Sequence, residues 1–262
     1  MKRVAAGTAP PGRSRRLWLW VTAALVALGA AAIGVLHSPW LSVDEIEIVG
    51  ARRADVARAV AAAGVGPGAI MIWVDTGAVE AEVRSDPWVR DARVSRVFPD
   101  RVVVEVLERE PALWIEGTAG WMLVSGDGTV VAAGPGPEDD GLLRALLIAP
   151  DRPIGERPDD PAWHEVVALA EALAPDLAAE SALTLRGSEL WLTIPGHSVR
   201  LGAPIDLADK GRVLQGLLAE DDLPFGAVID LIAPRRPAVV PATPLPAADP
   251  QVEGEGDGEG EG

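Results

Sequence analysis

Cysteine is absent from this 262-residue sequence, tyrosine is absent too, and lysine occurs only at Lys2 and Lys210. Without cysteine the chain has no disulfide framework, no thiol nucleophile and no thiolate metal site. Apolar residues make up 48% of the sequence and charged residues 24%. That composition excludes a wholly disordered chain and favours one or two folded domains with additional segments.

Charge is distributed unevenly along the chain. The formal net charge is −16, yet residues 1–16 contain no acidic side chain and five basic ones: Lys2, Arg3, Arg13, Arg15 and Arg16. The rest of the chain is therefore strongly acidic. Because binding to nucleic acid needs clustered Lys and Arg side chains that neutralise phosphates, we predict that nucleic acid is not a partner.

A long apolar run, residues 17–36, follows the basic segment. It reads LWLWVTAALVALGAAAIGVL and carries no charge over its twenty residues. A helix of that length measures about 30 Å, the hydrocarbon thickness of a bilayer. Trp18, Trp20 and Trp40 stand near its ends, where indole rings meet the membrane interface. We predict a single transmembrane helix over 17–36, with the lipid bilayer as its partner.

The basic flank also predicts the orientation. Because positive flanks stay cytoplasmic, residues 1–16 form a cytoplasmic segment and the remaining residues are extracytoplasmic, as in a single-pass type II protein of the inner or plasma membrane. A cleaved signal peptide is the alternative, since Ala30, Ala31 and Ala32 resemble a cleavage site. The apolar run exceeds the roughly 7–15 residues of a signal peptide, which favours an uncleaved anchor.

Residues 41–110 alternate strand and helix patterns at short intervals. The sequence VDEIEIV at 43–49 alternates apolar and acidic residues, as a half-buried strand does. Gly64 ends a helical pattern, and 98–100 connects two strands as a hairpin. The expected elements are a strand at 43–49, a helix at 53–63, an apolar run at 69–74, a helix capped by Asp75 or Thr76, and strands at 89–97 and 101–107. They predict a compact β-α-α-β-β unit.

Residues 111–240 are richer in short strands. Ser125 to Gly128 form a tight hairpin turn, and the Gly/Pro/Asp-rich stretch 134–160 is expected to be a loop crossing. Two helices are predicted, at 163–173 and 207–219, and strands at 183–185, 190–194, 199–202 and 227–232, the last of which leads to an apolar run at 238–240. The segment 241–262 ends EGEGDGEGEG and is predicted to be a disordered acidic tail.

Few residue patterns suggest catalysis or metal binding. His164-Glu165 opens like the zinc motif HExxH, but position 168 is alanine. His197 and Ser198 are neighbours on a strand and should point apart. The glycine-rich segment 64–68 follows a helix instead of opening one, so it is not a phosphate cradle. Glu108 and Glu110 flank Arg109 at the end of a strand. This position favours their interpretation as charged surface residues over a role as a general acid–base pair. We predict no catalytic, cofactor-binding or metal site, and no enzyme activity.

Four segments in order resemble one family. Residues 41–50, LSVDEIEIVG, look like an opening strand that ends in V-x-G. Asp86-Pro87-Trp88-Val89, with Ala92, Val94 and Phe98-Pro99, resembles a PWV segment, and 106–112, VLEREPA, resembles a V-x-E-R-x-P-x-A junction. The last segment contains Val199-Arg200-Leu201-Gly202, Lys210, Ile229-Asp230-Leu231 and Pro237. Together these residues resemble the FtsQ/DivIB family of bacterial cell division proteins.

The resemblance implies an α+β fold: a single N-terminal transmembrane helix, a POTRA domain at 41–110 and a strand-rich β-domain with two helices at 111–240. It also implies a non-enzymatic, bitopic scaffold of the division complex, the divisome. Such a scaffold binds FtsB/DivIC-like and FtsL-like single-pass proteins and other divisome components at the septum. There it helps to regulate septal peptidoglycan synthesis.

The last strands are the expected partner-binding site. A strand at 227–232 that lies at a sheet edge can pair its backbone with an added strand, while Arg235 and Arg236 pair with acids of the partner. The partner-binding residues on this hypothesis are Val228, Ile229, Asp230, Leu231, Arg235, Arg236 and Val239. The alternative is that 227–240 is an ordinary core strand followed by a basic surface turn.

Two other functions remain as alternatives at this point. A POTRA-type module in protein export would receive client strands, and it predicts tandem copies or a following β-barrel. A secreted cell-wall enzyme predicts a cleaved leader and a deep polar pocket within 111–240.

Overall fold

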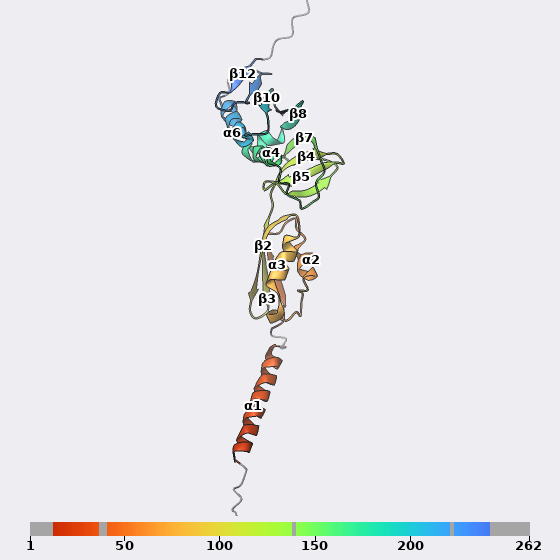
Figure 1. Ribbon diagram of the computed structural model, residues 1–262, viewed down its shortest axis with the longest axis vertical. Coiled ribbons are helices and arrows are strands. Elements are labelled where there is room, and N and C mark those ends of the chain that lie inside the picture. Colours follow the sequence, from red (N-terminus) through yellow and green to blue (C-terminus); the bar gives the residue numbers. More distant parts are fainter. Residues whose placement is uncertain (1–12, 37–40, 138–139, 221–222, 242–262) are drawn as a thin grey trace, which may run out of the picture. The chain divides into compact units, whose positions relative to one another are not determined.

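The computed structural model describes residues 13–36, 41–137, 140–220 and 223–241. The predicted acidic tail from residue 242 and most of the predicted cytoplasmic segment, residues 1–12, lie outside these ranges. By contacts the chain divides into two compact units, Met1–Glu110 and Pro111–Gly262. The apolar run belongs to helix α1, Arg13–Leu36 (Figure 1). Among the described residues, no helix combines the length and the apolar character that a membrane crossing requires.

The first unit contains a three-stranded sheet with two helices against it (Figure 1). Strand β3 is central, with β1 parallel on one side and β2 antiparallel on the other. The order along the chain is the predicted β-α-α-β-β, but 69–74 contains a single 3₁₀ turn, η2. The elements are β1 Glu45–Val49, α2 Val56–Ala62, η2 Met71–Trp73, α3 Thr76–Arg84, β2 Val89–Val97 and β3 Arg101–Glu108.

Aspartates start both helices of this unit, and valines fill its core. The Asp55 carboxylate accepts a hydrogen bond from the Arg58 N–H at 3.2 Å, and Asp75 accepts one from Ala78 N–H at 3.1 Å. Each aspartate satisfies an N–H group that a helix leaves without a partner at its first turn. The buried residues include Val56, Val60, Val79 and Val83 from the helices and Val102, Val104 and Val106 from β3.

The second unit is built on a nine-stranded sheet. Its strand order is β12-β11-β10-β9-β8-β7-β4-β5-β6. Helices α4 and α6 pack against each other and, with inward-facing strand residues, enclose one core (Figure 1). The strands are β4 Pro111–Gly117, β5 Trp121–Ser125, β6 Val130–Gly134, β7 Leu143–Ala149, β8 Ala182–Arg186, β9 Glu189–Ile194, β10 His197–Gly202, β11 Val228–Asp230 and β12 Ala238–Val240; the helices are α4 Pro161–Ala172, α5 Pro175–Ala179 and α6 Leu207–Leu218.

The prediction that 134–160 is a loop crossing was wrong for its middle part. Residues 143–149 form β7, which lies between β4 and β8 and runs parallel to both. Leu143 and Ala145 are fully buried in the core. A parallel strand has no hairpin turn beside it to reveal its position in the sequence. The surrounding glycines, prolines and aspartates therefore concealed a short apolar strand in the centre of the sheet.

Candidate partner-binding edge

The residues considered for catalysis have structural roles or lie apart. Glu165 accepts a hydrogen bond from the Leu207 N–H at 2.7 Å and so caps the start of α6. The His197 ring nitrogen Nδ1 lies 3.2 Å from the carbonyl oxygen of Pro195, two residues away. Within the described ranges, no three His, Cys, Asp or Glu side chains come close enough together to hold a metal ion.

Glu108 is an anion held by the backbone. Its Oε1 accepts hydrogen bonds from the N–H groups of Arg52, Arg53 and Ala54 at 2.7, 2.7 and 2.8 Å. Burial alone would raise the pKa of Glu108, but these three bonds and the Arg53 charge lower it below its ordinary value. Arg109 donates to the carbonyl oxygens of Pro87, at 2.9 Å, and Val89. The two side chains therefore join β3 to neighbouring segments of the first unit.

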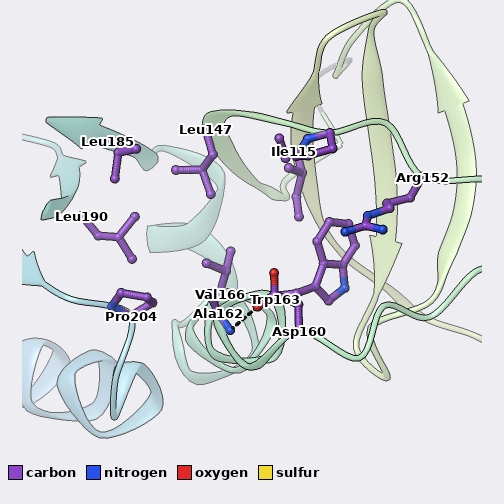
Figure 2. A pocket seen from close by; sticks show the side chains of 12 residues that line it. Ile115, Leu147, Arg152, Asp160, Ala162, Trp163, Val166, Leu185, Leu190 and Pro204 are labelled. Carbon is purple, nitrogen blue, oxygen red and sulfur yellow. Dashed lines mark hydrogen bonds between the residues drawn. The ribbon is translucent and has the colours of Figure 1, made fainter. Parts of the chain in front are cut away.

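A cavity of about 210 Å³ lies in the second unit between the sheet and the start of α4 (Figure 2). Apolar side chains line it almost entirely: Ile115, Leu147, Ala149, Pro150, Ala162, Trp163, Val166, Leu185, Leu190 and Pro204. Its two charged residues are engaged elsewhere. Arg152 pairs with Glu156 at 3.4 Å, and Asp160 caps α4 by accepting from Ala162 N–H at 2.9 Å. This cavity is therefore an apolar space and differs from the deep polar pocket expected for the cell-wall enzyme alternative.

The edge of the large sheet lies one strand further than predicted. Strand β11 is internal, because β10 pairs with it in parallel on one side and β12 pairs antiparallel on the other. The free edge is β12, whose three residues are all exposed. The order of strands depends on pairing across the whole sheet. The hydrophobic pattern of 227–232 alone therefore did not reveal that residues 238–240 pair with this strand and occupy its outer edge.

The seven predicted partner-binding residues fall into three groups by exposure. Ile229 and Leu231 are fully buried, so their side chains belong to the core and are not available to a partner. Val228 and Asp230 are half-buried on β11, whereas Arg235, Arg236 and Val239 are exposed in the loop and on β12. The structure thus places only the last three where a partner's side chains can meet theirs directly.

Val239 lies directly opposite Ile229 in the antiparallel pair β11–β12. Cross-strand partners project from the same face of a sheet, so Val239 extends the core side of the sheet to the edge. Val240, 54% exposed, lies opposite Val228 on the other face. Val240 was not among the predicted partner-binding residues. Because side chains alternate between the two faces of a strand, choosing Val239 for one face would have indicated Val240 for the other.

A groove adjoins the loop before β12. The first turns of α6 and the loop after β11 line this space of about 460 Å³, with Asp209, Arg212 and Val213 on the helix and Pro234 and Arg235 on the loop. Asp209 and Arg212 form an ion pair across one turn of α6. The groove therefore presents charges of both signs next to the apolar side chains of Val213 and Pro234.

An ion-pair network holds β11, and hence β12, in register. The Arg200 guanidinium donates to both carboxylate oxygens of Glu189, at 2.8 and 2.7 Å, and to Asp230 at 3.3 Å. The hydrogen bonds between Arg200 and Glu189 lower the pKa of the Glu189 carboxyl and raise the pKa of the Arg200 guanidinium. Three consecutive strands of the sheet, β9, β10 and β11, are joined in this way. The network was not predicted from sequence, because its members lie 11 and 30 residues apart.

Lys210 fixes α6 against the same part of the sheet. Its side chain is buried, and its Nζ donates to the carbonyl oxygens of Leu201 and Ala203 at 2.7 and 3.4 Å. Burial lowers the pKa of Lys210, with Asp206 and Glu165 opposing that shift. The sequence spacing between Gly202 and Lys210 is thus explained by the hydrogen bonds from Lys210, on α6, to the carbonyl groups at the end of β10.

Comparison with known proteins identifies the family of this chain. Residues 41–109 match the model of the POTRA domain, FtsQ-type. The cell division protein FtsQ of Mycolicibacterium smegmatis is 30% identical over 249 residues, which cover 91% of this chain and 71% of that protein. FtsQ of Anaeromyxobacter sp. (strain K) is 32% identical, covering 82% and 76% of the two chains, and FtsQ of Streptomyces venezuelae is 29% identical, covering 84% and 82%. The chain therefore belongs to the FtsQ family of cell division proteins.

Proposed function

We propose that this member of the division machinery is a non-enzymatic, bitopic scaffold. Residues 17–36 anchor it once in the inner or plasma membrane, residues 1–16 are cytoplasmic, and the remainder is extracytoplasmic at the septum. The uncharged twenty-residue run and the five basic residues before it support this arrangement. On this proposal residues 41–110 are the POTRA domain, residues 111–240 the β-domain and residues 241–262 a disordered tail.

The scaffold binds its partners at the β12 edge. The observation that carries this proposal is that β12 ends a nine-stranded sheet with all three of its residues exposed. An edge strand presents backbone N–H and C=O groups that a strand from another chain can pair with. A partner strand added there would become the tenth strand of the sheet, and its inward side chains would pack beside Val239.

The neighbouring side chains supply selectivity. Arg235 and Arg236 are exposed before β12, where they attract acidic residues of a partner. Exposed ion pairs contribute only about 0–1 kcal/mol each, so the arginines select the partner more than they hold it. Val239 and Val240 present apolar contacts on the two faces of the added strand.

The partners on this proposal are the extracytoplasmic segments of an FtsB/DivIC-like protein and an FtsL-like protein, together with other divisome components. Binding them in one complex at the septum is how the scaffold helps to regulate septal peptidoglycan synthesis. The family membership of the chain supports this role.

Two truncations of the full chain, reconstituted in lipid nanodiscs, test the binding site. Ending the chain after Pro241 removes only the tail, whereas ending it after Pro237 removes the tail and β12. Affinity for the two partner segments from the same organism is measured for both. We expect the longer variant to bind like the full chain and the shorter one to lose binding. Equal binding by the two truncations would refute the β12 edge as the site.

Paired point substitutions keep the test independent of chain length. Val240→Lys places a charge on the β12 edge, and Ala133→Lys places the same charge on β6, the opposite edge of the sheet. A lysine on an edge strand opposes further pairing. We expect Val240→Lys to weaken binding about tenfold, or about 1.4 kcal/mol, and Ala133→Lys to leave it unchanged.

A further inference from the structure

Several segments of the first unit converge at the end where the chain passes from residue 40 into the fold. The Val43 N–H donates to the Ala69 carbonyl at 2.7 Å, and the Asp44 N–H donates to the Asp100 carbonyl at 2.8 Å. The segment around Ala69 leads into η2, and Asp100 belongs to the turn between β2 and β3. We call this end of the unit, which contains residues 41–45, 69–75 and 96–101, the Leu41 end.

The Leu41 end exposes a cluster of large apolar side chains. Trp73 is 71% exposed, Phe98 58%, Ile72 47% and Val97 45%. Arg96 donates from Nη1 to the Ile72 carbonyl at 3.4 Å, which joins η2 to the end of β2. Among the described residues of 41–110, the other large apolar side chains with comparable exposure are Ile48, Val49 and Leu107. Four of the seven exposed large apolar side chains of residues 41–110 therefore belong to one end of this fold.

The charged side chains at the Leu41 end do not favour binding to an anionic lipid surface. Arg101 pairs with Glu45 at 3.1 Å and with Glu47 at 3.2 Å, so its charge is already compensated. The acidic residues Asp44 and Asp100 also lie here. The end is thus not basic enough to attract anionic headgroups. Its distinguishing feature is exposed tryptophan and phenylalanine, side chains that are favourable at the boundary between lipid and water.

The length of the chain limits where the Leu41 end can be. The proposed anchor ends at Leu36, and Leu41 is five residues later. Five residues span at most about 18 Å when fully extended. The headgroup layer on each side of a bilayer is roughly 5–8 Å thick. The Leu41 end is therefore the part of the folded unit that the chain keeps nearest to the lipid.

We propose that the Leu41 end rests on the outer surface of the membrane, with Trp73 and Phe98 inserted among the lipid headgroups. This inference rests on the membrane anchor of the proposed function. Contact at a second point restricts the rotation of the unit about its short connection to the anchor. The contact is apolar, so it neither requires anionic lipid nor weakens in salt.

The absence of cysteine allows a direct test, since a single introduced thiol takes one label. The full chain carrying Ile72→Cys, labelled with the fluorophore NBD, is placed in phosphatidylcholine nanodiscs that contain a lipid-borne nitroxide quencher. Ile72→Cys leaves Trp73 and Phe98 in place. Leu107→Cys is the control, because Leu107 is 57% exposed, compared with 47% for Ile72, and lies opposite Asp91, at the far end of β3 from Arg101.

We expect the label at residue 72 to be quenched several-fold more than the label at 107, with blue-shifted emission, in low and in high salt. Adding Trp73→Glu and Phe98→Glu to the residue 72 variant should reduce its quenching to that of the control. Both side chains are largely exposed, so these substitutions are compatible with folding. Quenching at 72 that equals that at 107, or that disappears in high salt, would overturn the proposal.

Flotation of the same full chain with vesicles separates this inference from the proposed anchor. A chain that does not float with vesicles would overturn the anchor and, with it, the contact of the Leu41 end. A chain that floats while its residue 72 label stays in water would overturn the contact alone and leave the scaffold and its β12 edge unaffected. Flotation together with quenching at 72 supports both.

Discussion

Replacing Glu108 by glutamine removes a negative charge that three backbone N–H groups share. Glu108 lies at the end of β3, and its Oε1 holds the segment 52–54 that precedes α2. Glutamine keeps an acceptor oxygen of the same size in the same place. The substitution therefore tests the contribution of the charge to these bonds and leaves the packing nearly unchanged.

Hydrogen bonds to a charged acceptor contribute about 1.5–3 kcal/mol each where water is excluded. Here Arg52 and Arg53 are exposed, so their N–H groups can bind water when the carboxylate is lost. We therefore expect Glu108→Gln to lower the free energy of unfolding of the first unit by about 1–2 kcal/mol, and Glu108→Ala by about 2–4 kcal/mol. The glutamine variant should then lose about 5–10 °C in melting temperature.

Two measurements on the full chain check this. Hydrogen exchange of the amides at 52–54 should accelerate, and the fluorescence of Trp88 should change, because the Arg53 guanidinium stacks 5.1 Å from the centre of its ring. Glu105→Gln, an exposed change on the same strand, is the control. Unchanged protection at 52–54 in Glu108→Gln would refute the reasoning.

The effect of Glu108 depends on pH in a defined direction. Its pKa in the folded protein lies below its ordinary value of 4.5, so the folded state binds fewer protons than the unfolded state just below that pH. The carboxylate therefore stabilises the fold fully above about pH 4.5, and this contribution is lost as the pH falls through the lower, folded pKa. The difference in stability between wild type and Glu108→Gln should shrink over the same range.

Substitutions at three further positions, Gly50, Lys210 and Arg200, with Gly64→Ala as the control for the first, test other contacts by denaturation or hydrogen exchange of the full chain. Gly50→Ala should cost about 3 kcal/mol or more, because φ is +89° and the new Cβ overlaps the Val106 carbonyl, whereas Gly64→Ala, at φ +77° with open space, should cost about 1–2 kcal/mol; equal costs would contradict this. Lys210→Met should cost about 1–3 kcal/mol. Because burial lowers the pKa of Lys210 below 10.5, wild type should gain stability relative to Lys210→Met as pH rises towards 10.5, and a constant difference would refute this. Arg200→Lys should accelerate hydrogen exchange in β11 and weaken partner binding, since the single nitrogen of lysine cannot replace the three guanidinium nitrogens that bond Glu189 and Asp230. Unchanged exchange would show that the network does not hold the strand.

Local patterns predicted most elements, and the structure explains the family-like segments physically. The segment Ile48-Val49-Gly50, which resembles the family's V-x-G, ends in a residue whose positive φ and contact with Val106 exclude a side chain. Glu108 and Arg109 bond the backbone at 52–54 and at 87–89. Glu108 and Arg109 thus hold backbone groups by hydrogen bonds, and Gly50 leaves room for a backbone carbonyl. They could be recognised in sequence because a backbone contact of this kind demands one residue type at one spacing.

Strand order could not be predicted in the same way. Strand β7 is enclosed by two parallel neighbours, and β11 is covered by a three-residue strand that follows a basic turn. Which strand lies at an edge depends on pairings between residues far apart in the chain, whereas a hydrophobic pattern reports only burial. The alternation at 227–232 is equally consistent with an edge strand and with a covered one. Residues 238–240, with apolar side chains and no alternation of polarity, gave no signal of an edge.

The nature of the proposed site explains why it escapes recognition from motifs. An enzyme site needs particular side chains, but a strand edge binds through N–H and C=O groups that every residue except proline possesses. Here the residues with demanding chemistry, Arg200, Glu189 and Lys210, lie behind the edge and fix the strands that support it. The edge itself needs only exposure, apolar side chains on both faces and a free backbone. Substitutions in the supporting network should therefore act through the position of β11, whereas those at Val239 and Val240 act on the partner directly.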